Sequence, residues 1–253
     1  MRDRERGDFA GLAKAMRAAA DYRPDPSQPP VELRLPFRGP WLTVRTPAQR
    51  VPSHGTHFGG QTFAFDFVAL DPRRRTAWVR DWRTVVATEP VERFIGFGKP
   101  ILAPARGRVV AVQDGEIDHE ARRSPLSLLS YATTQGARLR QGIGAVAGNH
   151  LILALEEQQA FVLLAHLRRG SINVPSGARV DVGDRVAACG NSGNSTQPHL
   201  HVHAMDSPSL PTSRGLPVVF RNYEAWSPVA ADPRLVGSGV PRRREVVAPL
   251  SRG

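Results

Sequence analysis

The sequence has little cysteine, little lysine and no long apolar run, and each shortage excludes a class of protein. Cys189 is the only cysteine among 253 residues, which excludes an internal disulfide and a zinc cluster built on cysteines. No apolar run is long enough to cross a membrane, so no membrane span is predicted. Any metal ion must therefore be held by histidine and carboxylate side chains.

The basic charge is carried almost entirely by arginine. The formal net charge is +11, and Lys14 and Lys99 are the only lysines among 34 basic residues. A basic surface suits anionic polymers in general. The arginines are scattered, however, and the short clusters at 73–75 and 242–244 have no aromatic residues interleaved with them. We interpret these clusters as solvated loops and predict no nucleic-acid partner.

Frequent turns and short apolar segments predict an all-β fold. The chain has 22 prolines and 23 glycines, and strand-like runs lie between them. We expect an antiparallel β-sheet or barrel-like sandwich, with a short N-terminal helix at 9–20 and an irregular C-terminal tail. Strands are predicted at 31–35, 41–45, 62–68, 108–112, 149–155, 159–166, 199–204 and 216–220, with a strand, turn and strand over 180–190.

The same patterns predict a domain organisation. Residues 1–30 are interpreted as a helix followed by a proline-rich linker, and residues 31–225 as one β domain. Within that domain, 114–145 breaks the β pattern and is interpreted as an insertion loop with a short helix near 126–131. Residues 226–253 are expected to form the C-terminal tail.

The most informative segment runs from Ser195 to His203 and places three histidines at alternate positions. Successive side chains of a strand point to opposite faces of the sheet. His199, His201 and His203 should therefore line one face, while Leu200 and Val202 point into a core. Imidazoles two residues apart on a strand can share one metal ion, or one can bind the metal while the other moves protons.

Other histidines and one acid could complete such a site. His54 and His57 lie in the segment 51–57, Asp66 follows on a β-prone run, and His166 ends another apolar run. Two histidines and one carboxylate are a common hydrolytic zinc set that leaves one position open for water. Asp66 lies between two phenylalanines, where a metal would compensate the cost of burying its charge.

The order of these motifs resembles that of the LytM/lysostaphin-type zinc metallopeptidases of family M23. The resemblance covers roughly residues 50–205, and its most specific part is Gly-Asn-Ser-Gly-Asn-Ser-Thr-Gln-Pro-His-Leu-His at 190–201. It implies the LytM type of β-fold, with a groove across the sheet. It also implies a metalloendopeptidase with one zinc ion per chain, acting on small-residue peptides such as peptidoglycan cross-links.

Roles in the site are carried over from the resemblance. Asp66 and His201 are similar to the family's metal ligands, and His166 and His199 to its catalytic pair. The chain has Thr62 where the family commonly has its first histidine, and it resembles a variant branch with a Ser-His-Gly-Thr motif. That likeness favours His54 as the remaining ligand, with His57 as the alternative. His203 stands where the family often has Glu or Gln, and it either orients His201, faces solvent or simply packs.

Three other functions compete with the peptidase. The first is a catalytically silent LytM-type module that binds or regulates the cell wall. The second is a biotinyl or lipoyl carrier, because 101–110 and 180–190 resemble its halves, but neither supplies the acceptor lysine. The third is a cupin-type metal barrel, whose expected later Glu is absent from 204–207.

The sequence leaves the cellular location and the assembly of the protein open. No signal peptide is recognisable at the N-terminus of the sequence. The resemblance implies the cell envelope or secretion, and a cytoplasmic location is the alternative. The bond and wall type cleaved, any activating partner, the oligomeric state and whether 114–145 covers the groove as a lid are likewise open.

Overall fold

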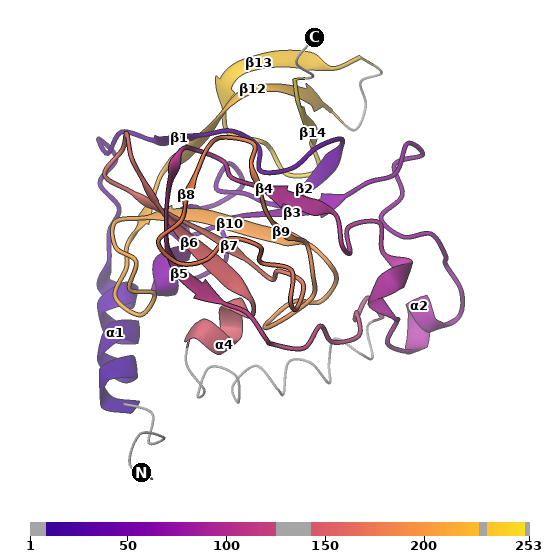
Figure 1. Ribbon diagram of the computed structural model, residues 1–253, viewed down its shortest axis with the longest axis horizontal. Coiled ribbons are helices and arrows are strands. Elements are labelled where there is room, and N and C mark those ends of the chain that lie inside the picture. Colours follow the sequence, from indigo (N-terminus) through magenta and orange to yellow (C-terminus); the bar gives the residue numbers. More distant parts are fainter. Residues whose placement is uncertain (1–8, 125–142, 228–231, 251–253) are drawn as a thin grey trace.

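The chain folds around one large β-sheet, and the all-β prediction is confirmed. The computed structural model describes residues 9–124, 143–227 and 232–250. In Figure 1 the C-terminal strands lie at one end of the molecule, while helices α1, α2 and α4 lie toward the other. Within the described residues, no helix is both long and apolar enough to traverse a bilayer.

The elements are short and follow one another closely along the chain. The helices are α1 (Phe9–Asp21), η1 (Phe58–Phe63), α2 (Arg83–Val86), η2 (Val91–Arg93) and α4 (Ile143–Ala147). The strands are β1 (Val31–Leu33), β2 (Trp41–Arg45), β3 (Phe65–Ala69), β4 (Pro100–Leu102), β5 (Gly107–Gln113), β6 (His150–Leu155), β7 (Phe161–Ala165), β8 (Arg179–Val180), β9 (Arg185–Ala188), β10 (Leu200–Met205), β11 (Gly215–Leu216), β12 (Val218–Trp226), β13 (Arg234–Gly239) and β14 (Val246–Pro249).

Most neighbouring strands are antiparallel. Along the large sheet the order is β1-β12-β14-β2-β3-β10-β7-β6-β5-β8, with β11 beside β10 and β13 beside β12. β1 and β12 pair in parallel, so the sheet is mixed. The strands predicted at 149–155 and 159–166 are present as β6 and β7, which pair antiparallel. β4 and β9 form a separate two-stranded sheet.

The two faces of the central strands differ in chemistry. On β10, Leu200, Val202 and Ala204 enter the main core, together with Phe65 and Phe67 of β3. The side chains between them point the other way, because a strand alternates its faces. That opposite face carries Asp66, His201 and His203, so the predicted alternation is confirmed.

Two sequence predictions need correction. Over 62–68 the structure has η1 before β3, because Gly59 and Gly60 adopt φ of 70° and 74° and turn the chain there. The C-terminal tail over 226–253 is not irregular, since it contains β13 and β14, which join β12 in the main sheet. Their partners include β1 and β2, close to the other end of the chain, and local sequence patterns do not reveal such distant pairings.

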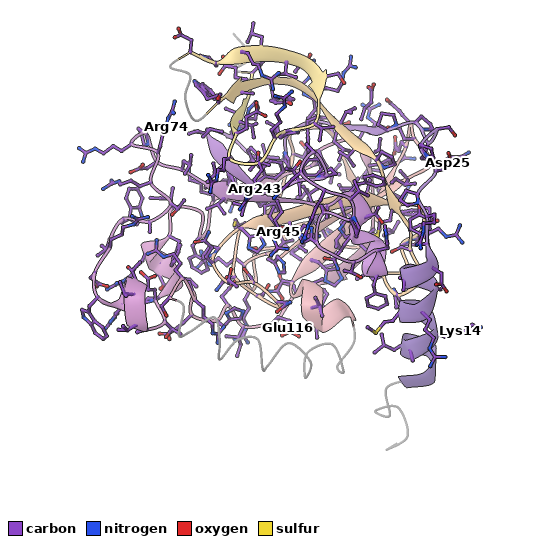
Figure 2. The ribbon with its side chains drawn as sticks, turned by 180° about the vertical axis from the view of Figure 1, so that it is seen from behind. Lys14, Asp25, Arg45, Arg74, Glu116 and Arg243 are labelled. Carbon is purple, nitrogen blue, oxygen red and sulfur yellow. The ribbon has the colours of Figure 1, made fainter. Side chains whose placement is uncertain are left out.

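The insertion and the surface charges complete the outline. Residues 125–142 lie outside the described residues, and so does the short helix predicted near 126–131. Figure 2 shows Lys14 on helix α1, on the opposite side of the molecule from Arg74. These two basic side chains therefore do not share one patch.

Candidate metal centre and active site

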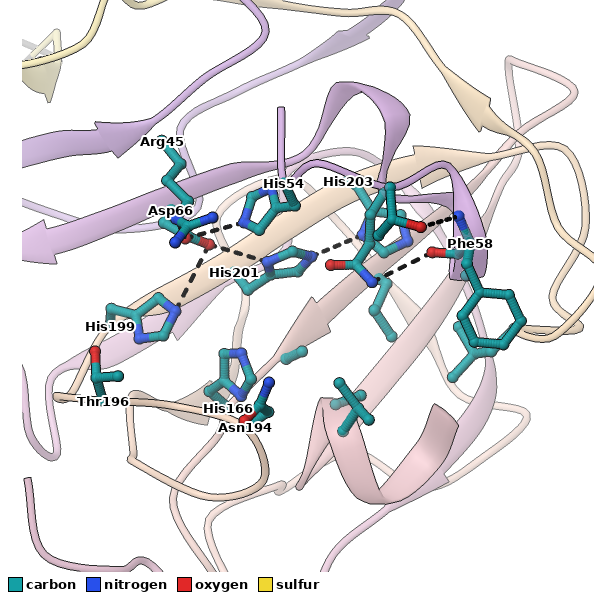
Figure 3. Close-up of a pocket in the computed structure, with 18 of the residues that line it drawn as sticks. Arg45, His54, Phe58, Asp66, His166, Asn194, Thr196, His199, His201 and His203 are labelled. Atoms are coloured by element: carbon teal, nitrogen blue, oxygen red, sulfur yellow. Dashed lines mark hydrogen bonds and ion pairs between the residues drawn. The ribbon is translucent and has the colours of Figure 1, made fainter. Parts of the chain in front are cut away.

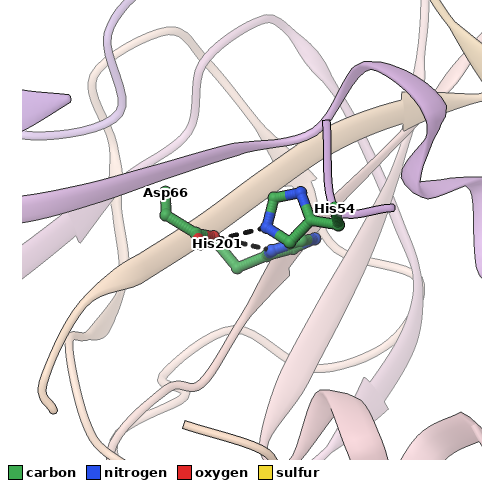
Figure 4. A group of neighbouring side chains, drawn as sticks. All are labelled: His54, Asp66 and His201. Atoms are coloured by element: carbon green, nitrogen blue, oxygen red, sulfur yellow. Dashed lines mark hydrogen bonds and ion pairs between the residues drawn. The ribbon is translucent and has the colours of Figure 1, made fainter. Parts of the chain in front are cut away.

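Three potential metal ligands from separate parts of the chain, His54, Asp66 and His201, lie close together. The Nε2 atom of His54 lies 3.0 Å from Oδ2 of Asp66, and Nδ1 of His201 lies 2.9 Å from Oδ1 (Figure 4). One donor atom from each of the three residues falls within 4.8 Å of the others. Asp66 and His201 are opposite each other in the β3–β10 ladder, so strand pairing fixes their approach.

His54 reaches the cluster from a turn that its neighbours hold in place. The Ser53 amide donates to the Thr62 carbonyl at 3.0 Å, and the Gly55 amide donates to the Pro52 carbonyl at 3.1 Å. The Ser53 hydroxyl donates to the Gln61 carbonyl at 3.3 Å, so it is an acceptor for Nδ1–H of His54 at 3.0 Å. A proton on Nδ1 leaves the Nε2 lone pair of His54 aimed at Asp66.

His57 lies apart from the three donors. Its Nδ1 is 3.0 Å from the Thr62 hydroxyl, and its ring packs edge-on against Tyr22 at 5.4 Å between centroids. The structure therefore places His54 beside Asp66 and leaves the alternative, His57, outside the cluster.

His203 is buried directly behind His201. Nε2 of His201 lies 2.9 Å from Nδ1 of His203, and His203 is only 1% exposed. The sequence allows three roles for His203, and the prediction that it faces solvent is wrong. Among the described residues, no hydrogen-bond partner is found for Nε2 of His203.

His166 and His199 present the same ring nitrogen to the site. Nδ1–H of His166 donates to the Ser192 carbonyl at 2.9 Å, and Nδ1–H of His199 donates to the Gln197 carbonyl at 2.9 Å. Their ring centroids are 4.7 Å apart. A neutral His166 is thereby left with its Nε2 lone pair free, whereas Nε2 of His199 faces Asp66, 3.6 Å from Oδ1.

A tightly packed loop sets the position of His166. A Cβ on Gly193 would lie 2.4 Å from the backbone nitrogen of Gly148, so only glycine fits at this position. The close approach holds the neighbouring Ser192 carbonyl against the His166 ring. His166 itself has φ of 59°, in the left-handed region that non-glycine residues seldom adopt. Such backbone strain gathers at functional sites.

The buried charges divide the histidines into two protonation types. Burial raises the pKa of Asp66, but His54 and His199 hold it well below its ordinary value. Burial lowers the pKa of His201 to about 4. Burial and the neighbouring His199 keep the pKa of His166 well below normal. Burial acts in the same direction on His199, but the Asp66 carboxylate outweighs it and raises the pKa of that ring.

Arg45 is a member of the site that the sequence analysis missed. Its Nε lies 3.6 Å from Oδ2 of Asp66, and its side chain is 50% exposed. Arg45 ends β2 and pairs with Asp66 in the ladder, after an irregularity in register. The pairing of β2 with β3 is the only signal for this role, and the local sequence does not contain it.

These residues line one cavity of about 720 Å³. Ligand pockets generally measure roughly 300–1,000 Å³, so the space suits a small molecule or a stretch of peptide. In Figure 3 Arg45, His199 and Thr196 lie toward one end, Phe58 lies at the other, and His201 and His203 lie between.

Comparison with known proteins gives one family model and several solved structures. Residues 130–210 match the sequence model of peptidase family M23. The catalytic domain of the antimicrobial peptidase lysostaphin from Staphylococcus simulans is 17% identical, over 70% of this chain and 88% of that one, with a TM-score of 0.36. No curated protein matches the chain in sequence.

Two further solved structures are similar at the same level. A mutant catalytic domain of the prophage-encoded M23 protein EnpA from Enterococcus faecalis is 18% identical over 69% of this chain and 88% of that one, with a TM-score of 0.37. A zinc-containing peptidase from Vibrio cholerae is 19% identical over 75% of this chain and 41% of that one, with a TM-score of 0.36.

Proposed function

Since the chain carries the sequence signature of peptidase family M23 over residues 130–210, we propose that it is a zinc metalloendopeptidase. The observation that carries the proposal is the convergence of His54, Asp66 and His201 within 4.8 Å. Two of these donors lie outside the matched residues, so the cluster supports the proposal independently of the family match. His166 and His199 are the proposed catalytic pair.

The donor set suits zinc in its chemistry. Two imidazoles and a carboxylate are typical of hydrolytic zinc sites. Zinc-binding histidines usually give their second ring N–H to an acceptor. Here the second nitrogen of His54 meets Ser53 at 3.0 Å, and that of His201 meets His203 at 2.9 Å. With these protons in place, both remaining lone pairs point toward Asp66, an arrangement that a cation between them would stabilise.

The catalytic pair would handle the proton and the developing negative charge. Zinc, when bound, acts as a Lewis acid and lowers the pKa of water to about 7. A neutral His166 offers Nε2 as the proton acceptor, because Nδ1–H is engaged by the Ser192 carbonyl. A protonated His199 can donate from Nε2 to the carbonyl oxygen of the scissile bond as it becomes negative. One ring thus takes a proton while the other stabilises charge.

The substrate class follows from the cavity and the family. An open cavity of about 720 Å³ across β-strands accepts an extended peptide. Ala165 lies opposite His201 in the β7–β10 ladder, so the floor beside the cluster carries a small side chain. We assign the substrate to peptide bonds between small residues, as in peptidoglycan cross-links, which the family resemblance implies.

Zinc binding and peptidoglycan hydrolysis by the purified protein test this function. We expect close to one zinc per chain by mass spectrometry of metals, release of soluble muropeptides from isolated cell walls, and loss of release after chelation with recovery on adding zinc. Zinc binding with no hydrolysis of any wall type would favour the silent binding module. Failure to bind zinc would refute the proposal.

A further inference from the structure

The floor of the cavity changes from polar to apolar along two paired strands. The ladder between β10 and β7 sets His201 opposite Ala165, His203 opposite Leu163 and Met205 opposite Phe161. His201 belongs to the proposed metal cluster, whereas Leu163 and Met205 belong to a small apolar cluster. On β10 the polar side chains of His201 and His203 are thus followed by Met205, and on β7 the cavity lining passes from Ala165 to Leu163.

Further apolar side chains line the cavity, beside the polar Thr56 and Gln61 that hydrogen-bond to the Phe58 backbone. Phe58 of η1 and Leu210 face the cavity with exposed fractions of 5% and 8%. Val146 lines it from α4, and Met16 of α1 lines it while staying 40% exposed. Phe58, Leu163 and Leu210 belong to one apolar cluster, and Met16 and Val146 line the same cavity from two helices.

The two ends of the groove are well separated. Figure 3 places Phe58 at one side of the drawn residues and Arg45, Thr196 and His199 at the other. We name the apolar part of the lining, formed by Met16, Phe58, Val146, Leu163 and Leu210, the apolar recess. A ligand that reached only the metal cluster would leave this recess in contact with water, which is unfavourable for apolar surface.

We propose that the apolar recess binds one large aliphatic side chain of the peptide substrate. The inference rests on the proposed function, in that a peptide occupies the groove. It makes the proposed substrate class more specific. The substrate residue beside Ala165 must be small, whereas the residue that enters the recess is large and aliphatic. A leucine-sized side chain can bury its surface against Leu163, Leu210 and Phe58, whereas glycine cannot.

Peptide binding measured without turnover tests this proposal. The probes are fluorescein-labelled hexaglycine and six variants, each with a single leucine at a different position, titrated with the metal-free protein and followed by fluorescence anisotropy. At one position we expect leucine to tighten binding by about tenfold or more, since even one methylene in a hydrophobic pocket is worth about 10- to 200-fold. Equal binding of all seven peptides would overturn the proposal.

Matched variants locate the effect in the recess. Met16→Glu places a charge on a half-exposed wall and should cancel most of the gain from leucine, while Met16→Leu should keep it. Leu235→Glu is the control, because Leu235 is 73% exposed on β13 and does not line the cavity. Thermal melting of each variant checks that it folds. If Met16→Glu and Leu235→Glu weaken the leucine peptide equally, the recess is not the binding site.

Cleavage assays separate this inference from the proposed function. The same peptides are incubated with the zinc-loaded protein and their products are identified by mass spectrometry. A gain in binding from leucine without cleavage of any peptide or cell wall would leave the recess intact and count against the peptidase. Cleavage combined with equal binding of leucine and glycine peptides would do the reverse.

Discussion

The two sides of the proposed metal cluster are held by different kinds of backbone. Asp66 and His201 face each other across paired strands, whereas His54 stands in a turn twelve residues before Asp66. Strand pairing fixes two donors by a ladder of backbone hydrogen bonds, while the turn depends on a few bonds around Ser53. The strand side is therefore preorganised, and the turn side is the part of the cluster that local changes can displace.

Removing a strand-borne donor should have the largest effect. His201→Ala takes away one proposed ligand from the rigid side, where strand pairing sets it opposite Asp66. We expect zinc to be lost and hydrolysis of cell walls to fall by at least about 10³-fold, because a bound metal supplies several kcal/mol of charge stabilisation. Metal content and muropeptide release measure the two losses. A His201→Ala protein that keeps both zinc and hydrolysis would disprove the assignment.

The buried strand histidine also predicts how the metal-free protein responds to acid. Burial sets the pKa of His201 to about 4, against an ordinary value of 6.5. Between these two pH values the unfolded chain binds a proton that the folded chain does not, so stability falls as pH falls. The contribution of His201 alone should be on the order of 3 kcal/mol, about a 150-fold change in the folding equilibrium. His166 and His203 add to it in the same direction, because burial lowers the pKa of both rings. Urea unfolding of chelated protein from pH 7 to pH 4 measures it.

His201→Gln provides the control for the acid response. Glutamine does not titrate in this range, so the fall in stability between pH 6.5 and pH 4 should become shallower. His199 changes the stability in the opposite direction. Because folding raises the pKa of His199, this ring stabilises the folded protein at low pH, and that stability is lost as the pH rises through the raised pKa. Asp66 acts only at lower pH, because its pKa is depressed below 3.8. An unchanged slope in His201→Gln would show that His201 is not buried in its neutral form.

Predictability from sequence follows the same division between strands and turns. Alternating residues around Asp66 and His201 correctly predicted which side chains enter the core and which form the opposite face, because the strand period is fixed. The position of Arg45 beside Asp66 could not be predicted, since it depends on which strand pairs with β3 and on an irregular register. The C-terminal strands β13 and β14 were not predicted for the same reason. They belong to a part of the sheet that is completed by β1 and β2, near the other end of the chain.

In the turn that carries His54, the motif resemblance predicts more than the local sequence pattern does. Spacing alone left His54 and His57 as alternatives, and the Ser-His-Gly-Thr likeness favoured His54, which the structure places beside Asp66. The details that hold it there are the Ser53 hydroxyl and the Gln61 carbonyl, both outside any periodic pattern. His203 is similar, because its burial and its bond to His201 arise from packing by η1 and β11, not from the strand pattern alone.

Substituting the two turn histidines sharpens the comparison. His54→Ala should lower zinc affinity by more than about 100-fold, because even a residue that only supports a ligand is usually worth 10- to 100-fold. His57→Ala is the matched control and should stay near the wild-type affinity, since His57 bonds to Thr62 and not to Asp66. Competition with a chromophoric chelator measures both affinities. The reverse order of effects would make His57 the ligand.

The smallest effect is expected from His203, which touches the rigid side of the cluster without joining it. With Nδ1 of His201 directed at the metal position, its Nε2–H donates to Nδ1 of His203 at 2.9 Å. His203→Leu removes that acceptor and should weaken zinc binding by about tenfold or more, while His203→Gln keeps an acceptor oxygen and should restore most of the affinity. Zinc competition and the nitrogen chemical shifts of His201 report the change. Equal affinities for the leucine and glutamine variants would mean that His203 fills space and does not fix the orientation of His201.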